Sequence, residues 1–309
     1  MVNYNMMKVL NIFKSINPFS NKNTDNKILY TIKILFTAGV LYFISLLIGE
    51  ALIIGGSYLF GYNATDNQLP YDIMLICSFY GYIVTILSFI IFVKKRNKDK
   101  LSKIGLDINF KTFFKGVLIG IVSLSLIIIL LILFGAIKFV GINNNVNWLF
   151  FGLYFGGYLI QGFMEELICR GFILHRLKEK LPIIVAIIIS ILFFSIGHFD
   201  KMFNESALIG IIGILNLIII SLIFVVITLK NKNIYGATGF HFIWNFTLFS
   251  IIGLNLSGLE TTNSIFKMEA VNKFLTGYSY GIESSIVCNS MLSLALVSLL
   301  LISKCNKSS

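Results

Sequence analysis

The stretch Met164-Glu165-Glu166-Leu167-Ile168-Cys169-Arg170-Gly171-Phe172 carries three ionisable side chains inside an otherwise apolar helical run. Because a charge at membrane depth costs a few kcal/mol or more, such residues normally face a protein interior or a wet cavity and indicate a functional site. Glu166 and Arg170 are four residues apart with the acid first, the favourable order for an ion pair within a helix. Glu165 points about 100° away around the same helix, so we predict a separate role for its carboxylate.

The composition places this helix in a membrane protein. Of 309 residues, 57% are hydrophobic and 13% are charged, and the mean hydropathy is +0.87. So few charges cannot cover the surface of a soluble globule. We therefore predict an all-α polytopic membrane protein with about eight transmembrane helices around an intramembrane polar cavity. The expected spans are 29–60, 72–93, 110–140, 148–175, 182–199, 207–229, 234–255 and 285–303.

The distribution of basic residues predicts the orientation. Twenty of the 25 Lys and Arg residues fall on one side of the predicted spans, Arg170 lies within a span, and only Lys138, Lys201, Lys267 and Lys273 fall on the other side. This bias places both termini in the cytoplasm of a multi-pass cell-membrane protein. The positive charge then indicates orientation and affinity for the lipid bilayer, and no nucleic-acid partner is needed to explain it. The abundance of Ile, Asn, Lys and Phe favours a bacterial source.

The chain divides into three predicted segments. Residues 1–28 lack the continuous apolar core of a cleaved signal peptide and are expected to form a short amphipathic helix on the membrane surface. Residues 29–303 form a single transmembrane domain, and 304–309 form a cytoplasmic tail. The polar loop 256–284 and the acid Glu50 in the first span have no role that their own residues reveal.

Further polar residues are predicted at similar depths in the membrane. Counted from the expected cytoplasmic ends, Glu165, His198 and Asn245 lie roughly 20–24 Å deep, and His241 lies roughly 14 Å deep. We expect these side chains to share one cavity. Each also has a structural interpretation, because transmembrane His and Asn often only form hydrogen bonds between helices. The Glu166–Arg170 pair, likewise, can be purely structural.

These residues form three motifs in separate predicted spans. The motifs are Glu165-Glu166-Leu167-Ile168-Cys169-Arg170, Phe194-Ser195-Ile196-Gly197-His198 and His241-Phe242-Ile243-Trp244-Asn245. Together they resemble the EExxxR, FxxxH and HxxxN pattern of the CAAX protease and bacteriocin-processing family, also called the abortive-infection family, whose members are intramembrane glutamic endopeptidases. The resemblance covers about residues 150–250, the predicted protease-like core.

The resemblance implies a role for each motif. Glu165 and His198 would activate a water molecule, and His241 and Asn245 would stabilise the oxyanion. Glu166, Arg170 and Phe194 would support the site or contact the substrate, a membrane-associated peptide or protein precursor. No metal and no cofactor is implied. These residue types suit peptide hydrolysis, which requires a base to activate water and donors that face the developing oxyanion.

Three other functions remain open from the residues alone. A zinc-dependent protease would use Glu165, His198 and His241 as ligands, although the usual HExxH spacing is absent. A transporter would also place Glu, Arg and His at mid-membrane, but the sequence has no repeated halves. A bacteriocin immunity or membrane binding protein of the same fold would not require cleavage.

Overall fold

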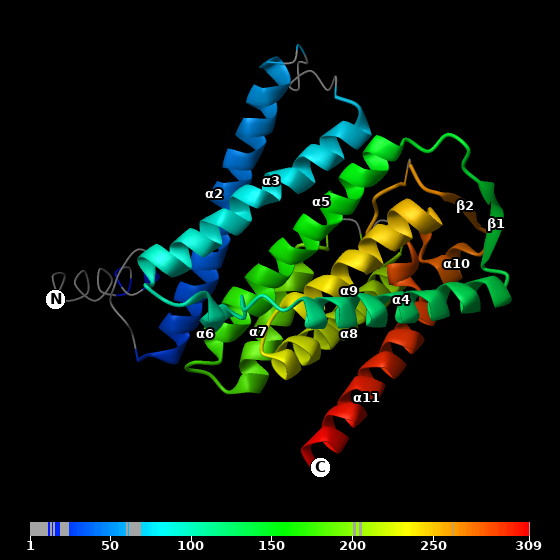
Figure 1. The fold of residues 1–309 in the computed structure, drawn as a ribbon. Helices are drawn as coiled ribbons and strands as arrows, with labels where there is room; N and C mark the ends of the chain where they lie inside the picture. Colours follow the sequence, from blue (N-terminus) through cyan, green and yellow to red (C-terminus); the bar gives the residue numbers. More distant parts are fainter. Residues whose placement is uncertain are drawn as a thin grey trace.

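The computed structural model describes residues 12, 14, 16–18, 25–59, 61, 69–199, 202–203, 206–261 and 263–308, with 302–308 described by backbone alone. Most of the predicted surface segment 1–28 lies outside these residues. The described chain is a packed set of helices with one small sheet (Figure 1). The longer helices are α2 (Lys27–Leu59), α3 (Tyr71–Ile91), α4 (Phe110–Leu133), α5 (Trp148–Glu166), α7 (Ile183–Ile196), α8 (Ala207–Asn231), α9 (Tyr235–Phe246) and α11 (Ile286–Ser308).

Shorter helical elements extend or connect these helices. The π-helical elements are η2 (Phe92–Arg96), η4 (Leu167–Leu174) and η5 (Thr247–Ile252), which continue α3, α5 and α9. The remaining short helices are η3 (Leu101–Ile104), α6 (His175–Leu177), α10 (Lys273–Thr276), η6 (Tyr278–Tyr280) and η7 (Ile282–Ser284). Because η4 and α6 follow α5 directly, the helix that carries both glutamates runs on to Leu177.

Four helices of the described chain are long and apolar enough to cross a membrane, namely α2, α3 with η2, α4 and α8. The molecule is therefore mostly helical and polytopic, as expected, but the predicted number of eight spans is not confirmed. Helix α7 shows why, because its 14 residues are fewer than the roughly 20 that a bilayer requires.

The predicted span 110–140 is too long. Helix α4 ends at Leu133, where Gly135 adopts a left-handed φ of 64°, a common way to end a helix. The following residues form strand β1 (Ile137–Ile142), which pairs antiparallel with β2 (Phe266–Ala270). The mostly helical fold therefore includes a small two-stranded sheet that was not predicted, and the loop 256–284 supplies its second strand.

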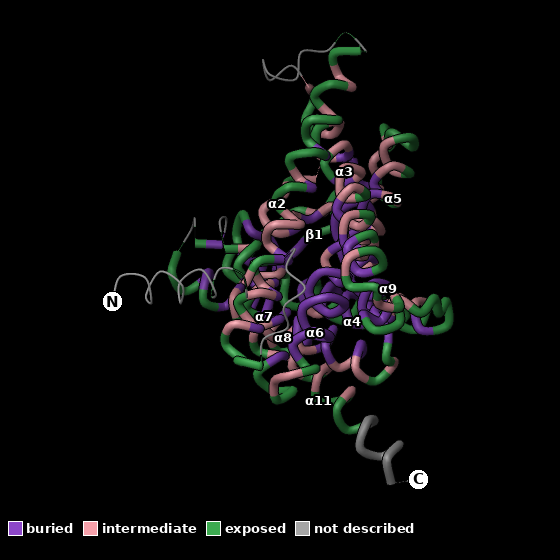
Figure 2. The backbone as a smooth tube through the Cα atoms, turned by 90° about the vertical axis from the view of Figure 1, so that its left-hand side faces the viewer, coloured by how far each residue is buried: buried purple, intermediate pink, exposed green. Residues whose placement is uncertain are grey.

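Side-chain caps and glycines position the helices around the site. Asn147 begins α5 by accepting a hydrogen bond from the Phe150 amide, which satisfies one of the unpaired amides of the first turn. Gly116 of α4 packs against the Gly236 carbonyl of α9, where a methyl group would overlap that oxygen. Figure 2 shows the buried residues concentrated in the middle of the molecule, around α9, which packs against α4, α5 and α8. Trp244 on α9 is among the largest fully buried side chains.

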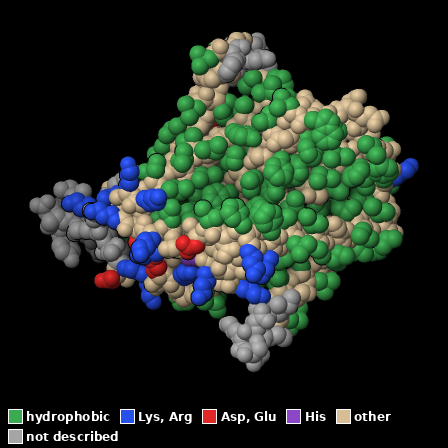
Figure 3. All heavy atoms as spheres, viewed as in Figure 1, with side chains coloured by type: hydrophobic (Ala, Val, Ile, Leu, Met, Phe, Trp, Pro, Cys, Tyr) green, Lys and Arg blue, Asp and Glu red, His purple; other side chains and the backbone are tan. Residues whose placement is uncertain are grey.

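The surface separates apolar from basic residues. In Figure 3 hydrophobic side chains cover most of the visible face, and Lys and Arg gather near the end of the molecule where α2 begins and α3 ends. An apolar face with basic residues at one end is the pattern expected of a multi-pass protein whose basic end faces the cytoplasm.

This orientation predicts a difference in labelling between two exposed lysines, Lys100 and Lys138. A membrane-impermeant maleimide added to intact cells should label Lys138→Cys and should miss Lys100→Cys, because the two positions lie on opposite predicted sides. Both variants should be labelled after the cells are permeabilised, with the native chain as background. Efficient labelling of Lys100→Cys in intact cells would refute the orientation.

Candidate active site

Three helices bring the predicted site residues together. Glu165 and Glu166 end α5, Phe194 lies on α7 with His198 just beyond its end, and His241 and Asn245 lie on α9. Directly after Glu166 the helix widens into the π-helical element η4, a departure from α-helical geometry that is frequent at functional sites. Gly162 allows α5 to approach α9 here, because a methyl group on it would lie 3.2 Å from the Phe242 amide nitrogen.

The Glu166–Arg170 pair forms as predicted. Arg170 Nη1 lies 2.8 Å from Glu166 Oε1, and both side chains are completely buried. Arg170 also donates to Ser221 Oγ on α8 at 2.5 Å. Its guanidinium lies 4.5 Å from the centre of the Phe194 ring and 5.0 Å from that of Phe224. The pair therefore joins α5, α7 and α8, and the contributions of Ser221 and Phe224 have no signal in the sequence.

Glu165 keeps one oxygen without a hydrogen bond. Its Oε1 accepts a hydrogen bond from Gln161 Nε2 at 3.2 Å, one helical turn earlier. Its Oε2 is buried and has no hydrogen-bond partner among the described residues, and the nearest cationic or imidazole nitrogen recorded is His241 Nε2 at 3.7 Å. A polar pair at this separation leaves room to share a water molecule.

His241 lies between the two glutamates. Its Nδ1 is 3.1 Å from Glu166 Oε1, so Nδ1 carries the proton and donates to the carboxylate. Its Nε2 consequently faces Glu165. The imidazole also stacks on the Phe224 ring, with 5.2 Å between the ring centres. The two carboxylates and Phe224 thus fix the orientation of this imidazole.

His198 and Asn245 approach the same cavity from two sides. His198 donates from Nδ1 to the Phe194 carbonyl at 3.0 Å, and its ring packs on Phe194 with 4.8 Å between the ring centres. The Asn245 amide donates to Gln161 Oε1 at 3.4 Å, a long and weak hydrogen bond. Within the described residues, no direct contact joins His198 to Glu165.

The cavity itself is small and has a wall that we did not predict. Its volume is about 50 Å³, and its polar lining is Gln161, His198, His241, Asn245, Ser257 and Glu283. Glu165 is not part of this lining, so the structure brings three of the four side chains expected there to the cavity. Glu283 accepts hydrogen bonds from Trp244 Nε1 at 3.1 Å and from the Ser257 amide at 2.8 Å. The segment between η5 and α11 therefore closes the cavity. Nothing in the spacing of Glu283 indicates this, because its partners lie on distant parts of the chain.

The described residues contain no group of three or more His, Cys, Asp or Glu side chains arranged to hold a metal ion. Glu165, His198 and His241, the ligands of the alternative zinc site, do not form such a group. His241 is instead oriented by the two carboxylates.

Comparison with known families gives one match, which covers the part of the chain that contains the candidate site. Residues 147–247 match the family model described as Rce1-like, type II CAAX prenyl endopeptidase. These residues form an Rce1-like domain. The match implies a peptide hydrolase that acts at a membrane. The Rce1-like domain extends from the start of α5 through α9 and includes every predicted site residue, whereas Glu283 and the sheet lie outside it. No curated protein and no solved structure matches the chain.

Proposed function

We propose that the chain is an intramembrane glutamic endopeptidase that needs no metal ion, with Glu165 as its general base. The observation that supports this most directly concerns Oε2 of Glu165, which is buried yet accepts no hydrogen bond from the described residues. Burying a carboxylate oxygen without a hydrogen-bond partner costs free energy. Such an oxygen is therefore expected where a water molecule or a substrate supplies the missing hydrogen bond.

The base acts together with His198. Since Nδ1 of His198 donates to the Phe194 carbonyl, the neutral imidazole presents Nε2 as an acceptor. In this proposal a water molecule donates to Glu165 Oε2 and to His198 Nε2 and attacks the scissile carbonyl through its oxygen. Proton transfer to Glu165 then produces the nucleophile.

The oxyanion is stabilised by His241 and Asn245. His241 acts here in its doubly protonated form, because Nδ1 donates to Glu166 and only a protonated Nε2 can donate to the oxyanion. These side chains are one turn apart on α9 and both line the cavity. Because the Asn245 amide forms only a 3.4 Å bond to Gln161, it exchanges that partner for a developing oxyanion at little cost. Donors placed in a buried site where negative charge develops stabilise the transition state strongly.

The substrate is a membrane-associated peptide or protein precursor. A cavity of about 50 Å³ holds water but not a peptide, so the substrate must displace part of its wall. In this proposal the described structure represents a closed form. The segment that carries Ser257 and Glu283 is the wall outside the Rce1-like domain, and we assign the opening movement to it.

Chelation tests the metal-independent mechanism. Membranes that contain the protein are incubated with and without EDTA and 1,10-phenanthroline, and the peptides released are identified by mass spectrometry. We expect the same peptides at unchanged yield, because Glu165 and His198 activate water without an ion. Loss of cleavage on chelation, restored by zinc alone, would show that the glutamic mechanism is wrong.

A further inference from the structure

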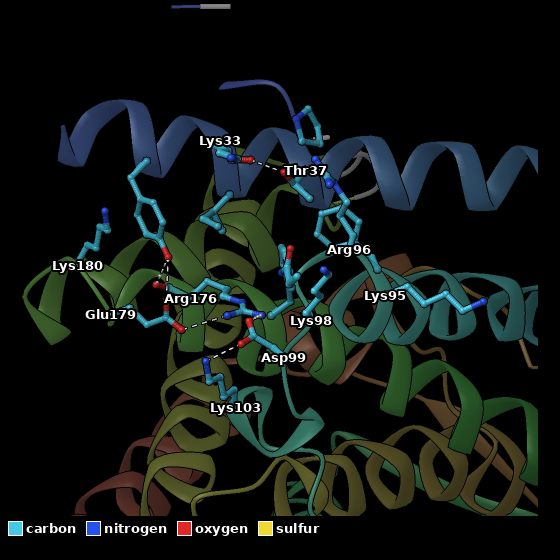
Figure 4. A pocket seen from close by; sticks show the side chains of 16 residues that line it. Lys33, Thr37, Lys95, Arg96, Lys98, Asp99, Lys103, Arg176, Glu179 and Lys180 are labelled. Carbon is cyan, nitrogen blue, oxygen red and sulfur yellow. Dashed lines mark hydrogen bonds and ion pairs between the residues drawn. The ribbon is translucent and has the colours of Figure 1, made fainter. Parts of the chain in front are cut away.

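A larger cavity, of about 660 Å³, lies apart from the active site at the predicted cytoplasmic end of the helices. Figure 4 shows it between the start of α2, the end of α3 with η2, and α6. Its volume falls in the range of small-molecule sites. Its charged lining is Lys33, Lys95, Arg96, Lys98, Lys103, Arg176 and Lys180, with the acids Asp99 and Glu179.

Both acids form ion pairs or hydrogen bonds with other residues that line the cavity. Asp99 forms ion pairs with Lys103 at 2.5 Å and with Arg176 at 2.7 Å. Burial disfavours the charged form of Asp99, but these bonds outweigh it and lower the pKa of the carboxyl below its ordinary value. Glu179 accepts hydrogen bonds from Arg176 and from Tyr30 Oη, both at 3.2 Å. Neither acid therefore neutralises the remaining cations.

The cavity retains positive charge without a counter-charge. In the part of the chain that the structure describes, Lys95, Arg96 and Lys98 pair with no carboxylate. Arg176 is only 5% exposed, and its Nε has no hydrogen-bond partner among the described residues. In Figure 4 Lys98, Asp99, Lys103 and Arg176 lie together beneath α2, whereas Lys95 points away. Cations clustered in a cleft concentrate a field that attracts anions.

The same cavity has an apolar side. Ile34, Phe92 and Phe172 line it beside the cations. Guanidinium and ammonium groups bind phosphate oxygens, and basic pockets between helices at the cytoplasmic side of a membrane bind anionic headgroups. We propose that this cavity is a binding site for a phosphate-bearing anion, either the headgroup of an anionic membrane lipid or a soluble phosphate compound. The site is separate from the proposed catalysis, so its test needs no cleavage assay.

Two probes distinguish the sources. Native mass spectrometry of the purified full chain in a non-ionic detergent measures binding of dioleoyl phosphatidylglycerol, with dioleoyl phosphatidylcholine as the neutral reference. Calorimetry with inorganic pyrophosphate measures soluble phosphate binding. The test variant is Arg96→Gln/Lys98→Gln, which breaks no recorded ion pair. The matched control is Lys94→Gln/Lys100→Gln, which removes the same charge from exposed positions of the same segment that do not line the cavity.

We expect the test variant to bind its phosphate probe roughly 25-fold more weakly, since each cation near the surface contributes about 1 kcal/mol and 1.4 kcal/mol is tenfold. The control should change binding less than about threefold, and Arg96→Lys/Lys98→Arg should restore it. Site-dependent binding of phosphatidylglycerol identifies a lipid headgroup, and site-dependent binding of pyrophosphate alone identifies a soluble ligand. If the test and control variants weaken probe binding equally, the proposal is overturned. It is also overturned if the chain binds phosphatidylglycerol no better than phosphatidylcholine and does not bind pyrophosphate.

Discussion

Glu165→Gln should lower peptide cleavage by roughly 10²- to 10⁴-fold, the range typical of losing a general base. The amide keeps the size of the side chain and its bond to Gln161, but it cannot accept a proton from water. Folding should be unaffected, because a neutral amide is easier to bury than a carboxylate. The measurement is mass spectrometry of the peptides released in membranes that contain equal amounts of wild type and variant.

Glu50→Gln is the matched control for this experiment. It makes the same chemical change at an exposed acid in α2, outside the site, so cleavage should stay at the wild-type level. Any cellular phenotype should be scored beside cleavage, because an immunity or binding protein would keep its phenotype without the base. If Glu165→Gln is as abundant as wild type and cleaves as fast, Glu165 is not the base.

Glu166→Gln should act on stability, with an expected loss of about 3–5 kcal/mol in the free energy of unfolding. Removing one partner of a buried ion pair leaves the other charge uncompensated, which accounts for a cost of this size. Arg170 is completely buried, and its other polar contacts are to Ser221, a neutral residue. The loss is measured by denaturant unfolding of the purified protein in detergent micelles.

A double variant separates the lost charge from lost packing. Glu166→Gln/Arg170→Met removes both charges and should be more stable than Glu166→Gln, since replacing a whole buried pair is often neutral or stabilising. The interaction energy between the two substitutions should then be well above the few tenths of a kcal/mol expected of independent sites. Additive losses would contradict the assignment of the instability to an unpaired Arg170.

The sequence by itself indicated the candidate site residues and how they are paired along each helix. The four-residue spacing of Glu166 and Arg170, and of His241 and Asn245, places each pair on one helix face whatever the surroundings are. Apolar runs also predicted where helices begin, since α4, α5 and α8 start at Phe110, Trp148 and Ala207 as expected. These features depend on periodicity within a single helix, so neighbours in sequence are sufficient to reveal them.

Tertiary structure decided which contacts those residues make with one another and with other helices. His241 lies between Glu165 and Glu166, which orient its ring, and Ser221 and Phe224 of α8 hold Arg170. Periodicity within α5 or α9 cannot show such contacts, because they depend on the rotation and depth of separate helices. The end of α4 is a similar case, since Ile137–Ile142 is apolar enough for a helix and becomes a strand because β2 pairs with it.

The wall of the cavity shows most clearly what the sequence cannot predict and the tertiary structure decides. Glu283 is 39 residues from Trp244 and 26 from Ser257 in sequence, yet it accepts hydrogen bonds from both. No spacing rule relates residues so far apart on a loop, so the sequence alone left 256–284 without a role. Only the folded chain brings Glu283 to the cavity, because the free energy that holds the loop there comes from contacts with other elements.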